Sequence, residues 1–250
     1  CHITEEQLPK LYESWQVVGT LKPEVAKELG FSEDVKVVAG AGDNAAAAVG
    51  TGTVGDGQCN ISLGTSGTIF ISSKEFGVDE NNALHSFDHA DGSYHLMGCM
   101  LSAASCNKWW SEEILKTKDF VAEQAPIQKL GENQVFFLPY LMGERSPHNN
   151  PDARGVFFGL SAMHTKKHML RAVMEGVAYS LRDCVEVFRE MGINVSDMMA
   201  CGGGGTSPLW RSMLADLYGC EVKTPASKEG PALGAALLAS VGAGIYGSVP

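Results

Sequence analysis

The sequence predicts an α/β fold in which a mixed β-sheet is flanked by helices. Two hairpins of alternating apolar residues come first, at residues 59–73 and 83–100. A long helical stretch follows at residues 165–191, and strand–helix units occupy residues 197–244. Hairpins early and strand–helix units late are typical of an α/β domain with antiparallel and parallel strands in one sheet.

The first elements are a polar, helix-like stretch at residues 4–14, interrupted by Pro9, and a short strand that begins at Val17. A helix is then expected from Pro23, a favoured first helical residue, to a stop at Gly30. Near Lys36 the composition changes from charged to Ala/Gly-rich. The sequence therefore predicts a domain boundary there, followed by a strand, a glycine turn and a small-residue helix.

The later elements begin with a helix at residues 102–118 and a buried strand around Phe136. In the helix at 165–191, apolar residues recur every three or four positions. The next strand is expected to end in four glycines, and Ser207-Pro208 to open a helix as cap and first residue. The last helix, after residue 229, has a small-residue face suited to packing close to a sheet.

Composition and charge narrow the function. Of 250 residues, 44% are hydrophobic and 19% charged, enough to bury a sizeable core. A formal charge of −10 argues against a nucleic-acid partner, although backbone N–H groups and magnesium can still hold a nucleotide. The chain shows no signal peptide and no run of 18 apolar residues, so no membrane span is expected. Seven scattered cysteines without CxxC spacing indicate reduced thiols in a cytoplasmic protein.

The segment "GAGDNA" at residues 40–45 has two interpretations. It fits the dinucleotide pattern GxGxxA, but so do two other glycine sets in this chain. Asp43 inside the turn would also repel a pyrophosphate, and no acidic residue follows at ribose-binding distance. Asp43 can instead be interpreted as an uncrowded carboxylate beside a helix N-terminus, suited to act as a general base. The pattern alone favours a plain N-cap, because Asp is a preferred cap residue.

Two glycine-rich segments can contact phosphate or nucleotide. "GTSGT" at residues 64–68 lies in a hairpin turn, where N–H and hydroxyl groups can surround phosphate oxygens, although the segment taken alone favours an ordinary tight turn. Gly202–Gly205 precede a helix, and four glycines let a flat ligand lie on the backbone. A Walker-type site is excluded because GxxxxGK[ST] is absent.

Two further groups favour structural interpretations. Paired charges in the loop 143–155 are typical of a solvated loop with local ion pairs; they are Glu144, Arg145, Asp152 and Arg154. His85, His89 and His95 flank an Asp91-Gly92 hairpin turn. We interpret these histidines as residues of a surface hairpin rather than as a metal cluster.

Taken together, these segments resemble the FGGY carbohydrate kinases. "AGAGDNAAAAVG" is similar to the family's catalytic segment, and "SLGTSGT" to its second phosphate-binding element. "GERSPHNNPDARGVFFGLSAMHTKKHMLRAVMEG" resembles the second family signature, and "CGGGGTSPLWRSMLADLYG" the adenosine element. The segment "GERSPH" resembles family members that act on xylulose more than family members that act on glycerol. The resemblance covers about residues 36–247. The four segments together, in this order, are specific to the family, whereas any one segment alone is not.

The resemblance implies a ribonuclease-H-like lobe of the actin and Hsp70 ATPase type, with ATP and magnesium as cofactors. It implies transfer of the γ-phosphoryl group of ATP to the terminal hydroxyl of D-xylulose, with Asp43 as the base and Asn44 on the sugar. The implied ATP-binding residues are Gly64, Thr65, Ser66, Gly67, Thr68, Gly143, Gly204 and Gly205, and no metal-ligating residue is implied. The expected partners are the sugar and ATP, not nucleic acid or membrane; the oligomeric state stays open, with a homodimer among the alternatives.

The family's first phosphate element is missing. We therefore interpret residues 1–35 as the last part of the N-terminal sugar-binding lobe, and residues 36–250 as the ATP-binding lobe with its end truncated. Alone, such a piece is expected to be inactive. The alternatives are another FGGY kinase for ribulose, gluconate or glycerol, an actin- or Hsp70-like ATPase, and a non-catalytic sugar-sensing relative.

Overall fold

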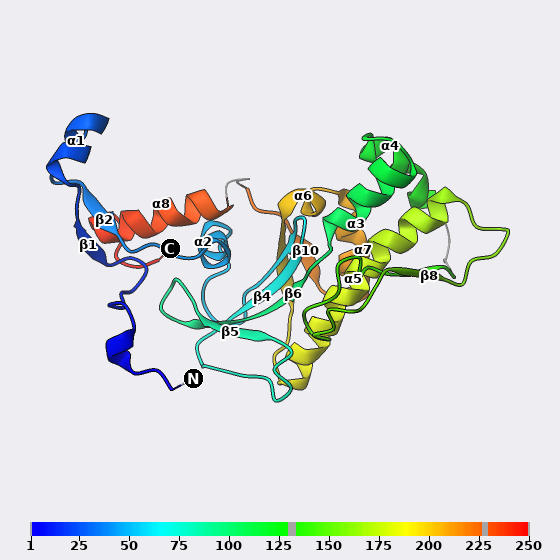
Figure 1. The fold of residues 1–250 in the computed structure, drawn as a ribbon, viewed down its shortest axis with the longest axis horizontal. Helices are drawn as coiled ribbons and strands as arrows, with labels where there is room; N and C mark the ends of the chain where they lie inside the picture. The colour runs from blue at the N-terminus through cyan, green and yellow to red at the C-terminus, as the bar shows by residue number, and fades with distance from the viewer. Residues whose placement is uncertain (1, 130–133, 227–229, 250) are drawn as a thin grey trace. The chain divides into compact units, whose positions relative to one another are not determined.

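The computed structural model describes residues 2–129, 134–226 and 230–249, so residues 1 and 250, which bound the two predicted domains, lie outside the described residues. The chain divides into two compact units, and each is described by itself (Figure 1). Unit 1 comprises Cys1–Gly55, Asp88–Ser93 and Ser227–Pro250. Unit 2 comprises Asp56–Phe87 and Tyr94–Ala226.

In unit 1, strand β1 (Val17–Thr20) pairs antiparallel with β2 (Lys36–Val38), and helix α1 (Pro23–Leu29) connects them. Pro23 lies in the first turn of α1, and Gly30 ends the helix with a left-handed φ of 71°, as predicted. The helix-like stretch at residues 4–14 is reduced to a 3₁₀ turn at Glu5–Gln7. Pro9, which lacks an N–H group, follows this turn and cannot extend it.

Helices α2 (Asp43–Gly50) and α8 (Gly230–Ala243) pack closely within unit 1. A β-carbon added to Gly234 would lie 1.8 Å from the carbonyl oxygen of Ala46, so only glycine permits this contact between the two backbones. At the other end of α8, a β-carbon on Gly242 would lie 2.6 Å from the side chain of Val38 in β2. The small-residue face of α8 was predicted to pack close to a sheet. It does so only at Gly242, beside β2, while the first part of α8 packs on helix α2.

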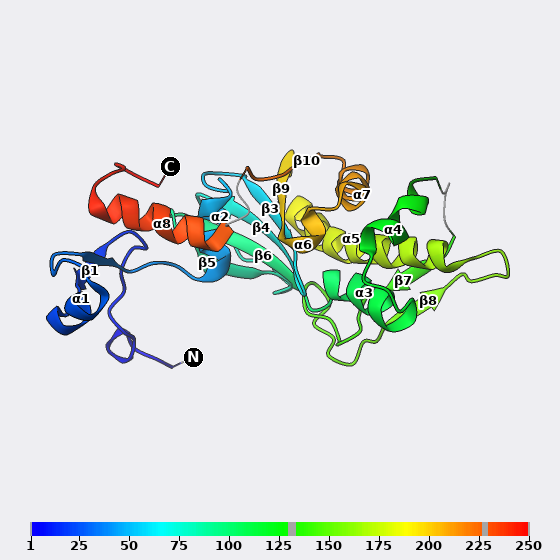
Figure 2. The same ribbon diagram turned by 90° about the horizontal axis from the view of Figure 1, so that it is seen from above.

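Unit 2 is built on a six-stranded sheet with the order β10-β9-β3-β4-β6-β5 (Figure 2). Strands β3, β4 and β6 pair antiparallel, while β9 runs parallel to β3 and β10 parallel to β9, which confirms the predicted mixed sheet. The three strands β3, β4 and β6 are buried along nearly their whole length. The bounds are β3 Cys59–Leu63, β4 Gly67–Ser73, β5 His85–Asp88, β6 Tyr94–Met100, β9 Asp197–Cys201 and β10 Glu221–Lys223.

The long helix α5 (Lys166–Glu190) contacts β4 and β6 and supplies much of the core. Its predicted apolar positions are all buried, at Leu170, Val173, Met174, Val177, Leu181, Val185 and Phe188. The remaining elements of unit 2 are α3 (Ala104–Trp109) with a π-helical turn (Trp110–Ile114), α4 (Phe120–Gln124), a 3₁₀ turn (Ala125–Lys129), the β7–β8 hairpin (Phe136–Leu138 and Val156–Phe158), α6 (Gly202–Gly205) and α7 (Pro208–Tyr218).

Two expectations about the strands of unit 2 are wrong. Strand β9 ends at Cys201, and the four glycines form the helical turn α6 instead of extending the strand. Gly202 turns the chain there with a φ of 75°. Strand β7 is half-exposed, because only Phe137 of its three residues is buried and the hairpin packs on α5 by one face.

The interpretation of the histidines of the Asp91-Gly92 hairpin as surface residues is wrong for His89 and His95, which are both buried. His89, in unit 1, is buried with its Nε2 3.0 Å from the carbonyl oxygen of Thr53. His95, in unit 2, is buried in β6 and stacks on Phe70 with ring centroids 4.1 Å apart. Within the described ranges, no three His, Cys, Asp or Glu side chains gather as metal ligands, and no helix has the length and apolarity of a membrane span.

Candidate functional site

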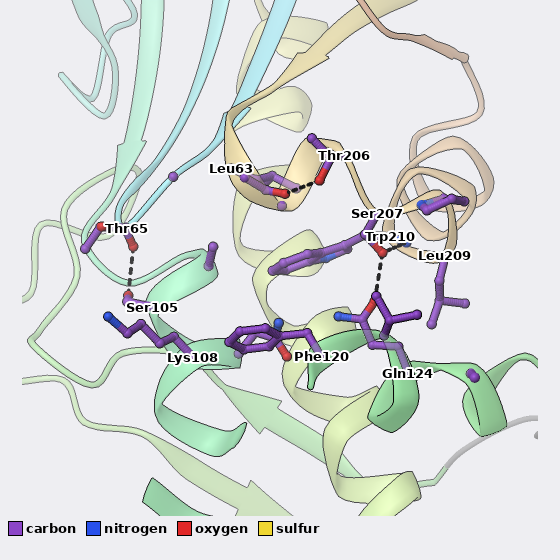
Figure 3. A pocket seen from close by; sticks show the side chains of 18 of the residues that line it. Leu63, Thr65, Ser105, Lys108, Phe120, Gln124, Thr206, Ser207, Leu209 and Trp210 are labelled. Atoms are coloured by element: carbon purple, nitrogen blue, oxygen red, sulfur yellow. Dashed lines mark hydrogen bonds between the residues drawn. The ribbon is translucent and has the colours of Figure 1, made fainter. Parts of the chain in front are cut away.

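Unit 2 contains a pocket of about 930 Å³ (Figure 3). One wall is the β3–β4 turn with the start of α3, a second is α6 with the start of α7, and α4 with the following 3₁₀ turn supplies the third. The lining residues are Leu63, Gly64, Thr65, Ala104, Ser105, Asn107, Lys108, Phe120, Val121, Gln124, Ala125, Gln128, Gly203, Gly204, Thr206, Ser207, Pro208, Leu209 and Trp210.

The β3–β4 turn is fixed to the start of α3 by its own carbonyl groups. The carbonyl oxygen of Thr65 accepts from the N–H of Ala103 (3.0 Å) and from the hydroxyl of Ser105 (2.7 Å). The carbonyl oxygen of Gly64 accepts from the N–H of Ala104 (2.9 Å). Carbonyl oxygens repel anions, so a turn whose carbonyls are bound within the protein can present its other groups to a negatively charged ligand.

The α6–α7 wall lies directly against β3. A β-carbon on Gly204 would lie 2.8 Å from Cβ of Leu63 and 2.9 Å from the ring of Trp210, so a larger residue would push α6 off the sheet. The indole of Trp210 is buried and donates to the carbonyl oxygen of Met174 in α5 (3.0 Å). Ser207 caps α7 by accepting from the N–H of Trp210 (3.3 Å), as predicted.

The two ends of the pocket differ in chemistry. Figure 3 shows Lys108 and Ser105 on the same side as Thr65, while Gln124 and Leu209 lie on the other side. Apolar side chains of Phe120, Val121, Leu209 and Trp210 line much of the remaining surface. A pocket with a cation and hydroxyls at one end and apolar groups at the other suits a ligand with an anionic group and a flat ring.

Three of the predicted ATP-binding residues line this pocket, namely Gly64, Thr65 and Gly204. The other five lie in unit 2 outside its lining. Ser66 completes the same turn, Gly67 and Thr68 begin β4, Gly205 ends α6, and Gly143 precedes Glu144 with a φ of 81°. Their part in nucleotide binding stays a prediction.

Asp43 and Asn44 belong to unit 1, where they begin helix α2 and are both exposed. The cap position is occupied by Gly42, so Asp43 is not the N-cap of α2. One carboxylate oxygen of Asp43 accepts from the N–H of Asn44 at 2.8 Å. The catalytic role of Asp43 stays a prediction.

Sequence reasoning missed two features of unit 2. It did not assign Lys108, Phe120 or Gln124 to a site, although Lys108 follows Ala104 and Ser105 at helical spacing and so shares their face of α3. It also interpreted Glu144 as part of a solvated loop, and that is wrong, because this residue is only 3% exposed. Two of its hydrogen-bond partners, Leu101 and Ser180, are distant in sequence, so a local pattern does not reveal them.

Comparisons with known proteins show the family to which this chain is similar. Residues 59–243 match the C-terminal domain of the FGGY family of carbohydrate kinases, and residues 1–50 match its N-terminal domain. The chain is 47% identical over 247 residues to the xylulose kinase of Escherichia coli (strain K12), covering 97% of this chain and 51% of that protein. It is 36% identical over 250 residues to the xylulose kinase of Bacillus subtilis (strain 168), covering 99% of this chain and 50% of that protein.

Solved structures give the same result for the fold. A xyloylose kinase from Brucella ovis superimposes with a TM-score of 0.90 at 35% identity, covering 98% of this chain and 51% of that one. A gluconate kinase from Lactobacillus acidophilus does so with a TM-score of 0.90 at 28% identity, covering 99% and 51%. These neighbours confirm the predicted ribonuclease-H-like fold. The chain spans about half the length of the curated relatives it matches, and it belongs to the FGGY family of carbohydrate kinases.

Proposed function

We propose that this chain supplies the nucleotide-binding part of an ATP-dependent sugar kinase that phosphorylates D-xylulose at its terminal hydroxyl. The observation that carries the proposal is the pocket of unit 2, whose cationic end adjoins the Gly64–Thr65 turn and whose remainder is largely apolar. The similarity to curated xylulose kinases from several bacteria supports the choice of sugar.

The phosphates are proposed to lie at the Gly64–Thr65 turn, with Ser66, Gly67, Thr68 and Gly143 as further contacts. Lys108 at the same end would neutralise part of their charge. The adenosine is proposed to lie between Phe120 and the Gly204–Gly205 turn, where apolar groups predominate. Backbone groups, hydroxyls and one cation together satisfy the needs of a triphosphate without a basic surface.

Magnesium is expected to enter with the nucleotide. Magnesium commonly keeps several waters and is held mainly by substrate phosphates. When bound, magnesium neutralises charge on the transferred group. The contribution of the chain itself is to position the nucleotide, since phosphoryl transfer depends mostly on positioning and electrostatic stabilisation.

Asp43 is proposed to accept the proton of the sugar hydroxyl. The oxygen of that hydroxyl then bonds to the γ-phosphorus of ATP, and ADP departs. Its carboxylate is exposed at the start of α2 and does not cap the helix, so it is free to meet a substrate. Asn44, the next residue, is proposed to orient the sugar. A cytoplasmic location accords with the use of ATP, and a homodimer remains a prediction.

The complete reaction is proposed to need more than this chain. Because the curated relatives are about twice as long, we propose that the sugar's other contacts come from the half that this chain does not cover. Residues 1–35 would then belong to the sugar-binding lobe and residues 36–250 to the ATP-binding lobe. The 250-residue chain alone is expected to form no ADP in response to sugar.

A sugar panel tests the proposed activity. ADP release by the complete enzyme that carries this chain would be measured with D-xylulose, D-ribulose, D-gluconate and glycerol at matched concentrations. We expect the highest kcat/KM with D-xylulose. Gluconate is the second candidate, because a gluconate kinase is among the structures that superimpose with a TM-score of 0.90. ADP release that no sugar stimulates would contradict both and indicate an ATPase.

A further inference from the structure

Glu144 is a buried carboxylate that the proposed reaction does not use. It is only 3% exposed, and its Oε1 accepts from the N–H groups of Leu101 (3.1 Å) and Arg145 (2.7 Å). Its Oε2 accepts from the hydroxyl of Ser180 in α5 (3.3 Å). Burial raises the pKa of Glu144 above its ordinary value, although these hydrogen bonds and the charge of His148 lower it in part. A carboxylate buried away from water needs hydrogen-bond donors from the protein, and it fixes the positions of the groups that donate to it.

The first group that Glu144 holds is the corner between β6 and α3. Leu101 follows the last residue of β6, and α3 begins at Ala104. The N–H group of Leu101 points to the Glu144 carboxylate, while those of Ala103 and Ala104 donate to the β3–β4 turn. The corner is therefore bonded on one side to Glu144 and on the other to the turn.

The second group is the loop that carries Glu144 itself. The N–H of Glu144 donates to the carbonyl oxygen of Asn150 (2.8 Å), and the N–H of Ser146 donates to the carbonyl oxygen of Cys99 in β6 (3.0 Å). One carboxylate thus joins three elements of unit 2, namely this loop, the β6–α3 corner and α5. A single buried group with three partners can fix their relative positions to a fraction of an ångström.

The corner matters because it sets the position of the pocket's cationic end, where the phosphates are proposed to bind. Thr65 O accepts from Ala103 N, Ser105 N and Ser105 Oγ, so any shift of the corner moves the turn. Ser105 and Thr65 both line the pocket. The path from Glu144 to the proposed phosphate site is therefore continuous, through two sets of hydrogen bonds.

We infer that Glu144 is a positioning residue for the nucleotide pocket, which acts by holding the β6–α3 corner and through it the Gly64–Thr65 turn. The inference rests on the proposed function for the identity of the ligand. The contacts themselves do not depend on it. A glutamine can replace the carboxylate, because its amide oxygen accepts from the same two N–H groups and its NH₂ group can donate to Ser180.

The test compares four forms of the complete enzyme that carries this chain: wild type, Glu144→Ala, Glu144→Gln and Tyr218→Phe. Tyr218→Phe is the matched control, because it also removes a buried hydrogen bond in unit 2, from Tyr218 Oη to the carbonyl oxygen of Ala178 (2.8 Å), without touching the corner. MgADP affinity would be measured by calorimetry, amide hydrogen exchange at residues 101–105 by NMR, and stability by thermal denaturation.

Glu144→Ala is expected to weaken MgADP binding about tenfold or more and to speed exchange at residues 101–105, since it removes the acceptor of two partly buried N–H groups, those of Leu101 and Arg145. Glu144→Gln is expected to stay within about threefold of wild type, as the conservative variant restores the bonds. Tyr218→Phe is expected to lower stability without changing affinity or exchange at the corner. If Glu144→Ala does not fold, Ser180→Ala, which removes only the Oε2 bond, is expected to give a smaller change of the same kind.

Three results would overturn the inference: unchanged exchange at the corner in Glu144→Ala, an equal loss of affinity in Tyr218→Phe, or a Glu144→Gln variant as weak as Glu144→Ala. Failure of the proposed function is distinguishable, because the wild-type complete enzyme would then bind no MgADP. In that case the exchange measurement still decides whether Glu144 holds the corner.

Discussion

Ser207 connects two walls of the pocket with a single hydroxyl. Its Oγ caps α7 by accepting from Trp210 N (3.3 Å) and donates to Oε1 of Gln124 in α4 at 2.9 Å (Figure 3). Ser207→Ala removes both bonds. Loss of a serine cap costs about 1 kcal/mol, and a neutral hydrogen bond contributes about 0.5–1.5 kcal/mol. We therefore expect the free energy of unfolding to fall by about 1.5–2.5 kcal/mol.

A double-mutant cycle separates the cap from the bond between the walls. Urea unfolding would be followed by tryptophan fluorescence in wild type, Ser207→Ala, Gln124→Met and the double variant. Because a chain of this size loses about 2–4 °C in Tm per kcal/mol, Ser207→Ala should unfold about 3–10 °C lower. The coupling between the two sites should be about 0.5–1.5 kcal/mol, the contribution of one hydrogen bond.

Ser207→Thr is the matched control, because it keeps a hydroxyl that can cap the helix. It should retain most of the stability that Ser207→Ala loses. A coupling energy near zero, or a threonine variant as unstable as the alanine variant, would refute the reasoning. Since the same bond holds α4 against the start of α7, MgADP binding should weaken in both single variants.

Three further predictions concern the proposed base, the glycine turn and the buried carboxylate. Asp43→Asn in the complete enzyme should lower kcat by about 10²–10⁴-fold with little change in the KM for ATP, and near-normal turnover would count against a catalytic role. Gly203→Val should weaken MgADP binding with the fold retained, because its β-carbon points into open space. Gly204→Val should instead lower Tm, because its β-carbon would meet Leu63. If calorimetry and thermal denaturation show the same behaviour for both variants, this distinction is mistaken. The pKa of Glu144 in the folded protein is raised above its ordinary value of 4.5. Between the ordinary pKa and the raised pKa, the folded protein therefore binds the proton of Glu144 more tightly than the unfolded chain does. The stability of wild type relative to Glu144→Gln should therefore rise as pH falls through that window, and urea titrations that show no change or the opposite slope would contradict this.

Local signals in the sequence predicted the elements that local chemistry decides. Ser207 and Pro208 mark the start of α7 because a hydroxyl cap and a fixed φ act within one helical turn. The apolar spacing from Leu170 to Phe188 predicted the buried face of α5, since that spacing matches the helical repeat. The Asp91-Gly92 turn was predicted in the same way, from residues that favour hairpin turns.

The rest depends on contacts between residues far apart in sequence. Gly202–Gly205 fold as a helical turn that fits closely between Leu63 and Trp210. The pattern of four glycines does not reveal these two contacts. Glu144 is buried because Leu101 and Ser180, 43 and 36 positions away, offer it hydrogen bonds. The wall formed by α4 is a short helix with no buried residue, so its sequence has no periodic signal to detect.

The most direct test of the proposed nucleotide site is a crystal structure of the complete enzyme grown with MgADP. The account predicts phosphates at the Gly64–Thr65 turn within reach of Lys108, and the purine between Phe120 and the Gly204–Gly205 turn. An enzyme that takes up no nucleotide at millimolar MgADP, or that binds it outside this pocket, would contradict the account.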